Sequence, residues 1–184
     1  MQSGLQDLDK AVRRVMAGDN DAFRLIVEQC STRLVRLGAR MLANVTDAED
    51  LVQEAFLRAH RALLDKQFDG HASVETWLFR IVTNMAIDQL RSRKRRGTVT
   101  EATDEMLTDA GNAPEFRLAL RELDQWMSDI APEQRAVLVL SAMDGFSNAE
   151  IAQIMNCSEG SVEQRLVRGR AALRQMRSLE HDEN

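Results

Sequence analysis

Apolar residues recur at the spacing of an α-helical face through most of this chain, and this periodicity constrains the fold more than any other feature. β-Sheets are poorly supported, because only 4% of the residues are aromatic and tyrosine is absent. A length of 184 residues suits one domain or two small ones, since domains run from about 50 to 250 residues. The sequence therefore predicts an all-α protein, and the pattern along the chain must decide how many domains it has.

Four helices joined by short connections are predicted up to about Arg96, and together they suggest a bundle. Small polar residues mark where three of these helices begin. Asp19–Asp21 are expected to cap the second helix, Thr46 or Asp47 the third, and Ser73 the fourth.

A polar, acidic stretch without apolar periodicity separates this bundle from a second helical unit, which contains Pro132 at a predicted helix start. Such a stretch predicts a flexible linker. The expected organisation is therefore two small helical domains, residues 1–96 and 114–178, joined by the linker 97–113 and followed by an acidic tail, 179–184.

The stretch EIAQIMNCSEGSVEQRL, residues 150–166, fits a helix-turn-helix. Asn156 tolerates the left-handed backbone conformation of the turn, and Ser158 is suited to cap the second helix. Val162 and Leu166 then fall on the buried side of that helix. The opposite face carries a mixed set of side chains that can read base edges, although a plain helical hairpin with solvated arginines is the alternative.

Opposite charges gather in separate segments, which the formal net charge of -5 conceals. Residues 89–97 hold five basic side chains and no acid, and residues 162–178 hold five arginines against one acid. Acids gather instead at 44–54 and 98–115. Because a phosphate backbone responds to charge within a Debye length of about 10 Å, two exposed basic ends are compatible with nucleic-acid binding. The first basic run is equally explained as a solvated helix end.

Three stretches together resemble regions 2 and 4 of bacterial sigma factors of the extracytoplasmic function (ECF) group, in the right order and over nearly the whole chain. They are DAEDLVQEAFLRAHRAL, FDGHASVETWLFRIVTNMAIDQLRSRKR and PEQRAVLVLSAMDGFSNAEIAQIMNCSEGSVEQRLVRGRAAL. The resemblance implies a promoter-specificity subunit of RNA polymerase without catalytic chemistry, and no cofactor is expected. The N-terminus lacks a hydrophobic signal core, so the expected compartment is the cytoplasm. The resemblance also implies three partners: core RNA polymerase, promoter DNA and an anti-sigma factor. No apolar run is long enough to predict membrane insertion.

The resemblance also assigns residues to three surfaces. Polymerase binding falls on the third helix, where an acidic edge suits a basic partner, although a merely solvated acidic face is the alternative. Its residues are Asp47, Asp50, Leu51, Gln53 and Glu54. Binding of the melted minus-ten element falls on Phe68, Asp69, Gly70, Ser73, Arg80, Asn84, Asp88 and Arg91. Trp77 is a further candidate for base stacking, but its helical spacing with Ile81 favours a core position.

The minus-thirty-five duplex is assigned to the second helix of the helix-turn-helix and its surroundings. The residues are Ser141, Glu163, Gln164, Arg165, Val167 and Arg168. A basic residue is frequent in the family at the position of Glu163, so the preferred bases are expected to differ here.

Two other functions are compatible with parts of the pattern. A dimeric transcription regulator would share the helix-turn-helix but would need a sensor or dimerisation domain. A carboxylate-bridged metal enzyme would need Glu-x-x-His pairs, and His60, His71 and His181 are not so placed. Cys30 and Cys157 lack metal-type spacing and are expected to be inert thiols.

Overall fold

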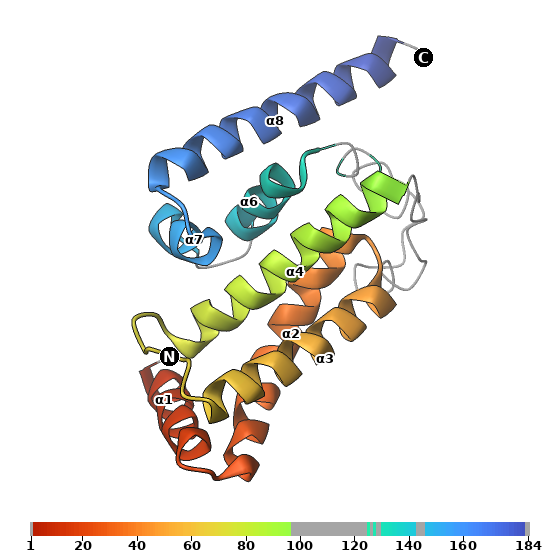
Figure 1. Ribbon diagram of the computed structural model, residues 1–184. Helices are drawn as coiled ribbons and strands as arrows, with labels where there is room; N and C mark the ends of the chain where they lie inside the picture. Colours follow the sequence, from red (N-terminus) through yellow and green to blue (C-terminus); the bar gives the residue numbers. More distant parts are fainter. Residues whose placement is uncertain (1, 97–124, 126, 128–129, 143–145, 183–184) are drawn as a thin grey trace.

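A computed structural model describes residues 2–96, 125, 127, 130–142 and 146–182 (Figure 1). Every regular element within these ranges is a helix, which confirms the all-α prediction. The elements are α1 (Gln2–Met16), the short 3-10 helix η1 (Asn20–Ala22), α2 (Phe23–Leu42), α3 (Val45–Leu64), α4 (Val74–Arg96), α6 (Pro132–Ala142), α7 (Asn148–Met155) and α8 (Glu159–Asp182).

Helices α1 to α4 pack together around an apolar core that contains Ile26, Leu34, Leu63 and Phe79, none of them measurably exposed. The sequence produces this bundle because each helix carries its apolar residues on one side. The predicted four-helix unit is therefore present.

Two of the predicted helix caps differ from the structure. The third helix is capped by Asn44, whose side-chain oxygen accepts from the backbone N–H of Asp47 at 2.9 Å, so Thr46 and Asp47 lie inside the helix. Asp19 accepts from Nε of Arg14 at 2.9 Å and makes no cap, because η1 leads directly into α2. Ser73 does cap α4, as predicted, by accepting from the N–H of Thr76 at 3.1 Å.

Helices α6, α7 and α8 form the second unit, and its turn follows the predicted helix-turn-helix. Asn156 ends α7 in the left-handed conformation, with φ 48° and ψ 53°. Ser158 caps α8 by accepting from the N–H of Ser161 at 3.2 Å. The predicted linker 97–113 and residues 114–124, the start of the predicted second domain, lie outside the described residues. Helix α8 continues to Asp182, which is beyond the predicted start of an acidic tail.

The second unit packs directly against the first, with α6 and α7 lying between α8 and α4 (Figure 1). Arg135 on α6 is only 2% exposed, and its Nη2 donates to the main-chain oxygen of Arg40, at the end of α2, at 2.8 Å. The rings of Phe79 on α4 and Phe146 before α7 meet with their centroids 4.8 Å apart. The two units therefore form one packed body, with α4 at the junction.

Candidate nucleic-acid interface

The outer face of α8 presents the side chains that were predicted to read a duplex. Val162 and Leu166 hold the inner face in the core, and Gly169 lets α8 approach α6, because a Cβ there would lie 2.8 Å from Cδ1 of Leu138. On the outer side five residues line an open depression of about 410 Å³: Gly160, Glu163, Gln164, Val167 and Arg168. Val167 is 68% exposed, which leaves its methyl groups free to contact a thymine methyl.

The two remaining residues of the predicted minus-thirty-five set are held within the protein. Arg165 is half-buried, and its Nη1 donates to Sγ of Cys157 at 3.3 Å. The hydroxyl of Ser141 donates to the main-chain oxygen of Leu138 at 2.9 Å. The structure therefore brings four of the six predicted residues onto one free face and gives the other two partners inside the unit.

The predicted minus-ten residues of α4 share one side of that helix, and this side faces the second unit. Arg80 donates from Nε and Nη2 to the main-chain oxygen of Gln153 at 3.1 and 2.7 Å. Arg91 forms an ion pair with Glu133 of α6. Asn84 and Asp88, between them, are exposed.

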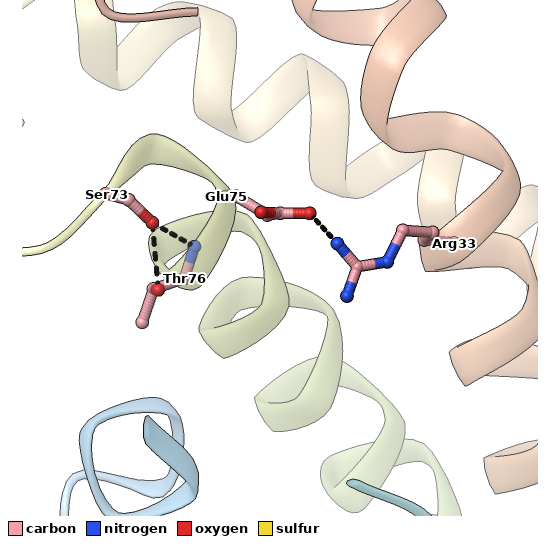
Figure 2. Close-up of polar contacts among 4 residues, drawn as sticks. All are labelled: Arg33, Ser73, Glu75 and Thr76. Atoms are coloured by element: carbon pink, nitrogen blue, oxygen red, sulfur yellow. Dashed lines mark hydrogen bonds and ion pairs between the residues drawn. The ribbon is translucent and has the colours of Figure 1, made fainter. Parts of the chain in front are cut away.

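The loop before α4 holds the other predicted minus-ten residues. The ring of Phe68 packs against half-buried Trp77, with centroids 5.0 Å apart, so Trp77 belongs largely to this local cluster. Asp69 accepts from the N–H of His71 at 2.9 Å, and Gly70 has φ +74°. Ser73 also lies 2.9 Å, oxygen to oxygen, from the hydroxyl of Thr76, as Figure 2 shows.

The acidic edge of α3 is only partly free. Asp50, Gln53 and Glu54 are exposed, and Glu54 accepts from Nε of Arg58 at 2.9 Å. Leu51, predicted to contact polymerase, is 6% exposed and lies in the core. Asp47 lies 2.6 Å from Nη2 of Arg93, so the acidic edge and the basic run are joined at this point. The two oppositely charged segments of the sequence therefore meet at this point, because the end of α4 reaches the start of α3.

Sequence reasoning missed the residues that hold the two units together. Arg33 is ion-paired with Glu75 at the start of α4 (Figure 2), and its Cζ lies 5.2 Å from the ring centroid of Phe79 and 5.5 Å from that of Phe146. A sequence signal existed for Phe146, which is an apolar aromatic in a polar turn. No periodic pattern pointed to Arg33.

A basic cavity of about 500 Å³ also opens where α4 meets α6, lined by Asp88, Arg91, Lys94, Arg95 and Pro132. Within the described ranges, no three His, Cys, Asp or Glu side chains gather as a metal site would require. None of the helices described is long and apolar enough to cross a bilayer.

Comparison with known proteins decides the family. The model for sigma-70 region 2 matches residues 26–96, and the model for sigma-70 region 4 matches residues 120–173. The ECF RNA polymerase sigma factor SigW of Bacillus subtilis is 36% identical over 94% of this chain and 98% of its own length. This chain belongs to the ECF group of the sigma-70 family.

Two solved structures share the fold of this sigma factor. One is CnrH in complex with the cytosolic domain of CnrY, with a TM-score of 0.68, 25% identity, and coverage of 97% of this chain and 99% of that one. The other is the sigma factor RpoE in complex with the anti-sigma factor NepR from Bartonella quintana. It has a TM-score of 0.64, 23% identity, and coverage of 85% of this chain and 96% of its own.

Proposed function

We propose that this sigma factor directs core RNA polymerase to its promoters through two DNA-reading surfaces, one on α8 and one on α4 and its preceding loop. The observation that supports this most is the outer face of α8. It leaves Glu163, Gln164, Val167 and Arg168 exposed on a helix-turn-helix whose turn and cap are formed. Residues 1–96 and 114–178 would be the two functional domains.

Reading of the minus-thirty-five duplex rests on the chemistry of that α8 face. Arg168 can donate two hydrogen bonds to guanine, and Gln164 can pair with adenine. Glu163 can accept a hydrogen bond from cytosine, whereas family members frequently have a basic residue at this position. Ser141 and Arg165 lie behind this face, so their contribution would be to the adjacent backbone.

Reading of the melted minus-ten strand rests on α4 and its loop. Arg80 and Arg91 supply positive charge, and Asn84 and Asp88 lie exposed between them. The loop residues Phe68, Asp69, Gly70 and Ser73 border the start of this helix and would form the pocket for an unstacked base.

Polymerase binding is proposed on the exposed part of the α3 edge, at Asp50, Gln53 and Glu54. Exposed carboxylates favour a basic partner surface and disfavour DNA. Asp47 and Leu51 would support this edge from its paired and buried side. A specificity subunit of this kind supplies no chemistry of its own, and it acts in the cytoplasm with the polymerase.

An anti-sigma factor is the proposed regulator. The support is the family, together with the structural likeness to CnrH and RpoE, both solved with a bound protein. Such a partner would compete for the polymerase-binding or DNA-binding surfaces.

Run-off transcription with bacterial core RNA polymerase, with and without this protein, tests the proposal. Discrete transcripts are expected only when the protein is present. If the protein neither co-purifies with core polymerase nor supports any specific transcript, the proposed function is wrong.

A further inference from the structure

The basic run at the end of α4 divides between two sides of that helix. Arg93 turns toward α3, where its guanidinium pairs with Asp47. Lys94 and Arg95 are exposed and line the basic cavity of about 500 Å³ between α4 and α6. Neither of these two side chains forms an ion pair with any residue that the structure describes. Two cations therefore face the cavity with their charge uncompensated by the described protein.

Arg91 adds a third cation to the same wall of the cavity. It lies three and four residues before Lys94 and Arg95, and residues at these spacings are neighbours on a helix surface. Asp88, one turn earlier, is the one carboxylate among the lining residues. The wall formed by α4 therefore carries three positive charges against one negative charge.

The start of α6 forms the opposite wall, at Pro132. A helix start carries partial positive charge, so this wall also favours an anion. The next residue, Glu133, already places its carboxylate on Arg91. Burial alone would raise the pKa of this carboxyl, but its own backbone N–H and Arg91 lower the pKa below the ordinary 4.5. An anionic group is therefore stabilised at this junction by the protein itself.

A solvated helix end explains only part of this cluster. Basic side chains in the last turn of a helix are stabilised by its macrodipole, which accounts for Lys94 and Arg95 as such. Arg91 lies before that last turn, and the helix dipole does not explain why a second helix closes the space in front of all three cations. The enclosure indicates a ligand site more than a solvated surface does.

The size and charge distribution of the cavity favour a short polyanion. Its volume falls within the range of about 300 to 1,000 Å³ that is typical of small-molecule sites. Nucleic-acid strands bind instead along extended basic grooves that follow the backbone. Linked phosphate groups suit three cations within one helical turn, because an arginine can bind two phosphate oxygens at once and a lysine adds a point charge.

We propose that the cavity between α4 and α6 binds an oligophosphate, an anion with two or more linked phosphate groups, through Arg91, Lys94 and Arg95. Asp88 weakens this binding by repulsion. The ligand competes for Arg91 with Glu133 and with any strand bound along α4. An inorganic chain and the phosphates of a nucleotide share this chemistry, and the experiment separates these two sources.

Isothermal titration calorimetry of the full-length protein with sodium tripolyphosphate, at low ionic strength and without divalent metal, tests the site. One site per chain is expected. Lys94→Gln with Arg95→Gln should weaken binding at least about tenfold, because a single hydrogen bond to a charged group is commonly worth that factor. Lys10→Gln with Arg13→Gln is the matched control, since it makes the same change in net charge at exposed residues of α1. This control should bind tripolyphosphate as the wild type does.

Asp88→Asn tests the site in the opposite direction. It removes the lining carboxylate, so it should strengthen tripolyphosphate binding by about two- to fivefold, a gain that partial unfolding would not produce. Circular dichroism confirms that each variant is folded. Adenosine triphosphate, titrated in the same way, identifies the source of the ligand: tighter binding than that of tripolyphosphate indicates a nucleotide, and equal or weaker binding indicates a phosphate chain.

Two results would overturn the proposed site. One is tripolyphosphate binding that falls equally in the α4 variant and the α1 control, or in neither, because it would show only general attraction between charges. The other is a wild-type protein that does not bind tripolyphosphate, whereas Lys94→Gln with Arg95→Gln lowers its affinity for mixed-sequence single-stranded DNA. That result would assign the cations to a nucleic-acid backbone. Neither measurement needs polymerase or a promoter, so the site and the proposed function fail separately.

Discussion

The carboxylate of Asp47 lies 2.6 Å from Nη2 of Arg93, and Nη1 of the same arginine donates to the main-chain oxygen of Leu42 at 3.2 Å. One guanidinium thus ties the end of α4 to the end of α2 and the start of α3. The side chain of Arg93 is only 13% exposed, so solvent screens this contact less than it screens a surface pair.

Arg93→Ala is therefore expected to lower the free energy of unfolding by about 1 to 3 kcal/mol, because a carboxylate and a carbonyl lose a charged partner. Urea denaturation measures this loss. Arg95→Ala in the same basic run is the matched control, since Arg95 is exposed, and its effect should stay within about 0.5 kcal/mol. Equal effects of the two substitutions would contradict the assigned role of Arg93.

Polymerase association should depend on the exposed acidic edge of α3. Asp50→Arg combined with Glu54→Arg reverses two charges that face solvent, so it is expected to abolish co-purification with core polymerase while the far-ultraviolet circular dichroism spectrum stays unchanged. Glu28→Arg on α2 is a charge-reversed control that should still co-purify. Retention of the α3 variant by core polymerase would rule out this edge as the docking surface.

Two arginines of α8 should separate base reading from phosphate binding. Arg168 belongs to the outer face, and Arg170 is exposed beside it. Arg168→Ala is expected to cost about 1 to 3 kcal/mol and to relax the preference at one base pair, if the arginine is bidentate to guanine. Arg170→Ala should weaken binding about equally for all sequences and reduce its salt dependence. Anisotropy titrations on a panel of upstream duplexes measure both effects, and equal loss across that panel for Arg168→Ala would remove it from base reading.

The helical pattern predicted much of this molecule because helix-forming residues act locally. The limits of α7, the left-handed Asn156 and the cap at Ser158 all depend on residues within one turn. The docking of the two units was not predictable in that way. Arg80 and Gln153 are far apart in the sequence, and the acceptor is a main-chain oxygen that every residue possesses. The outer α8 face was predictable from periodicity alone, whereas the pairing of Asp47 with Arg93 required knowing how α4 crosses the end of α2.

Both thiols were expected from the sequence to be inert, but the structure predicts that they differ sharply in reactivity, because Cys30 is buried and Cys157 is only half-buried. Burial, with a smaller contribution from the charge of Glu75, raises the pKa of Cys30 to about 12, so almost no thiolate forms at neutral pH. Cys157 is half-buried in the turn of the helix-turn-helix. The native protein is expected to react with a disulfide reagent at one thiol and to expose the second only in denaturant. Cys157→Ser should remove the fast reaction, whereas fast labelling of Cys30 in the native state would contradict its burial.

Docking of the two units should weaken in acid because of Glu133. Burial alone would raise the pKa of this carboxyl. Its own backbone N–H, the side chain of Arg91 on α4 and the charge of Arg165 on α8 all lower the pKa, and together they hold it below the ordinary 4.5. A carboxyl whose pKa is lowered by docking stabilises the docked state at pH values above the ordinary pKa of the group. This stabilisation is lost as the pH falls through the lowered pKa. The radius of gyration of the wild type should therefore grow as the pH drops below about 4.5. In Glu133→Gln the same titration should begin from a more expanded protein and respond less. An identical acid response in both proteins would show that groups other than Glu133 control the separation.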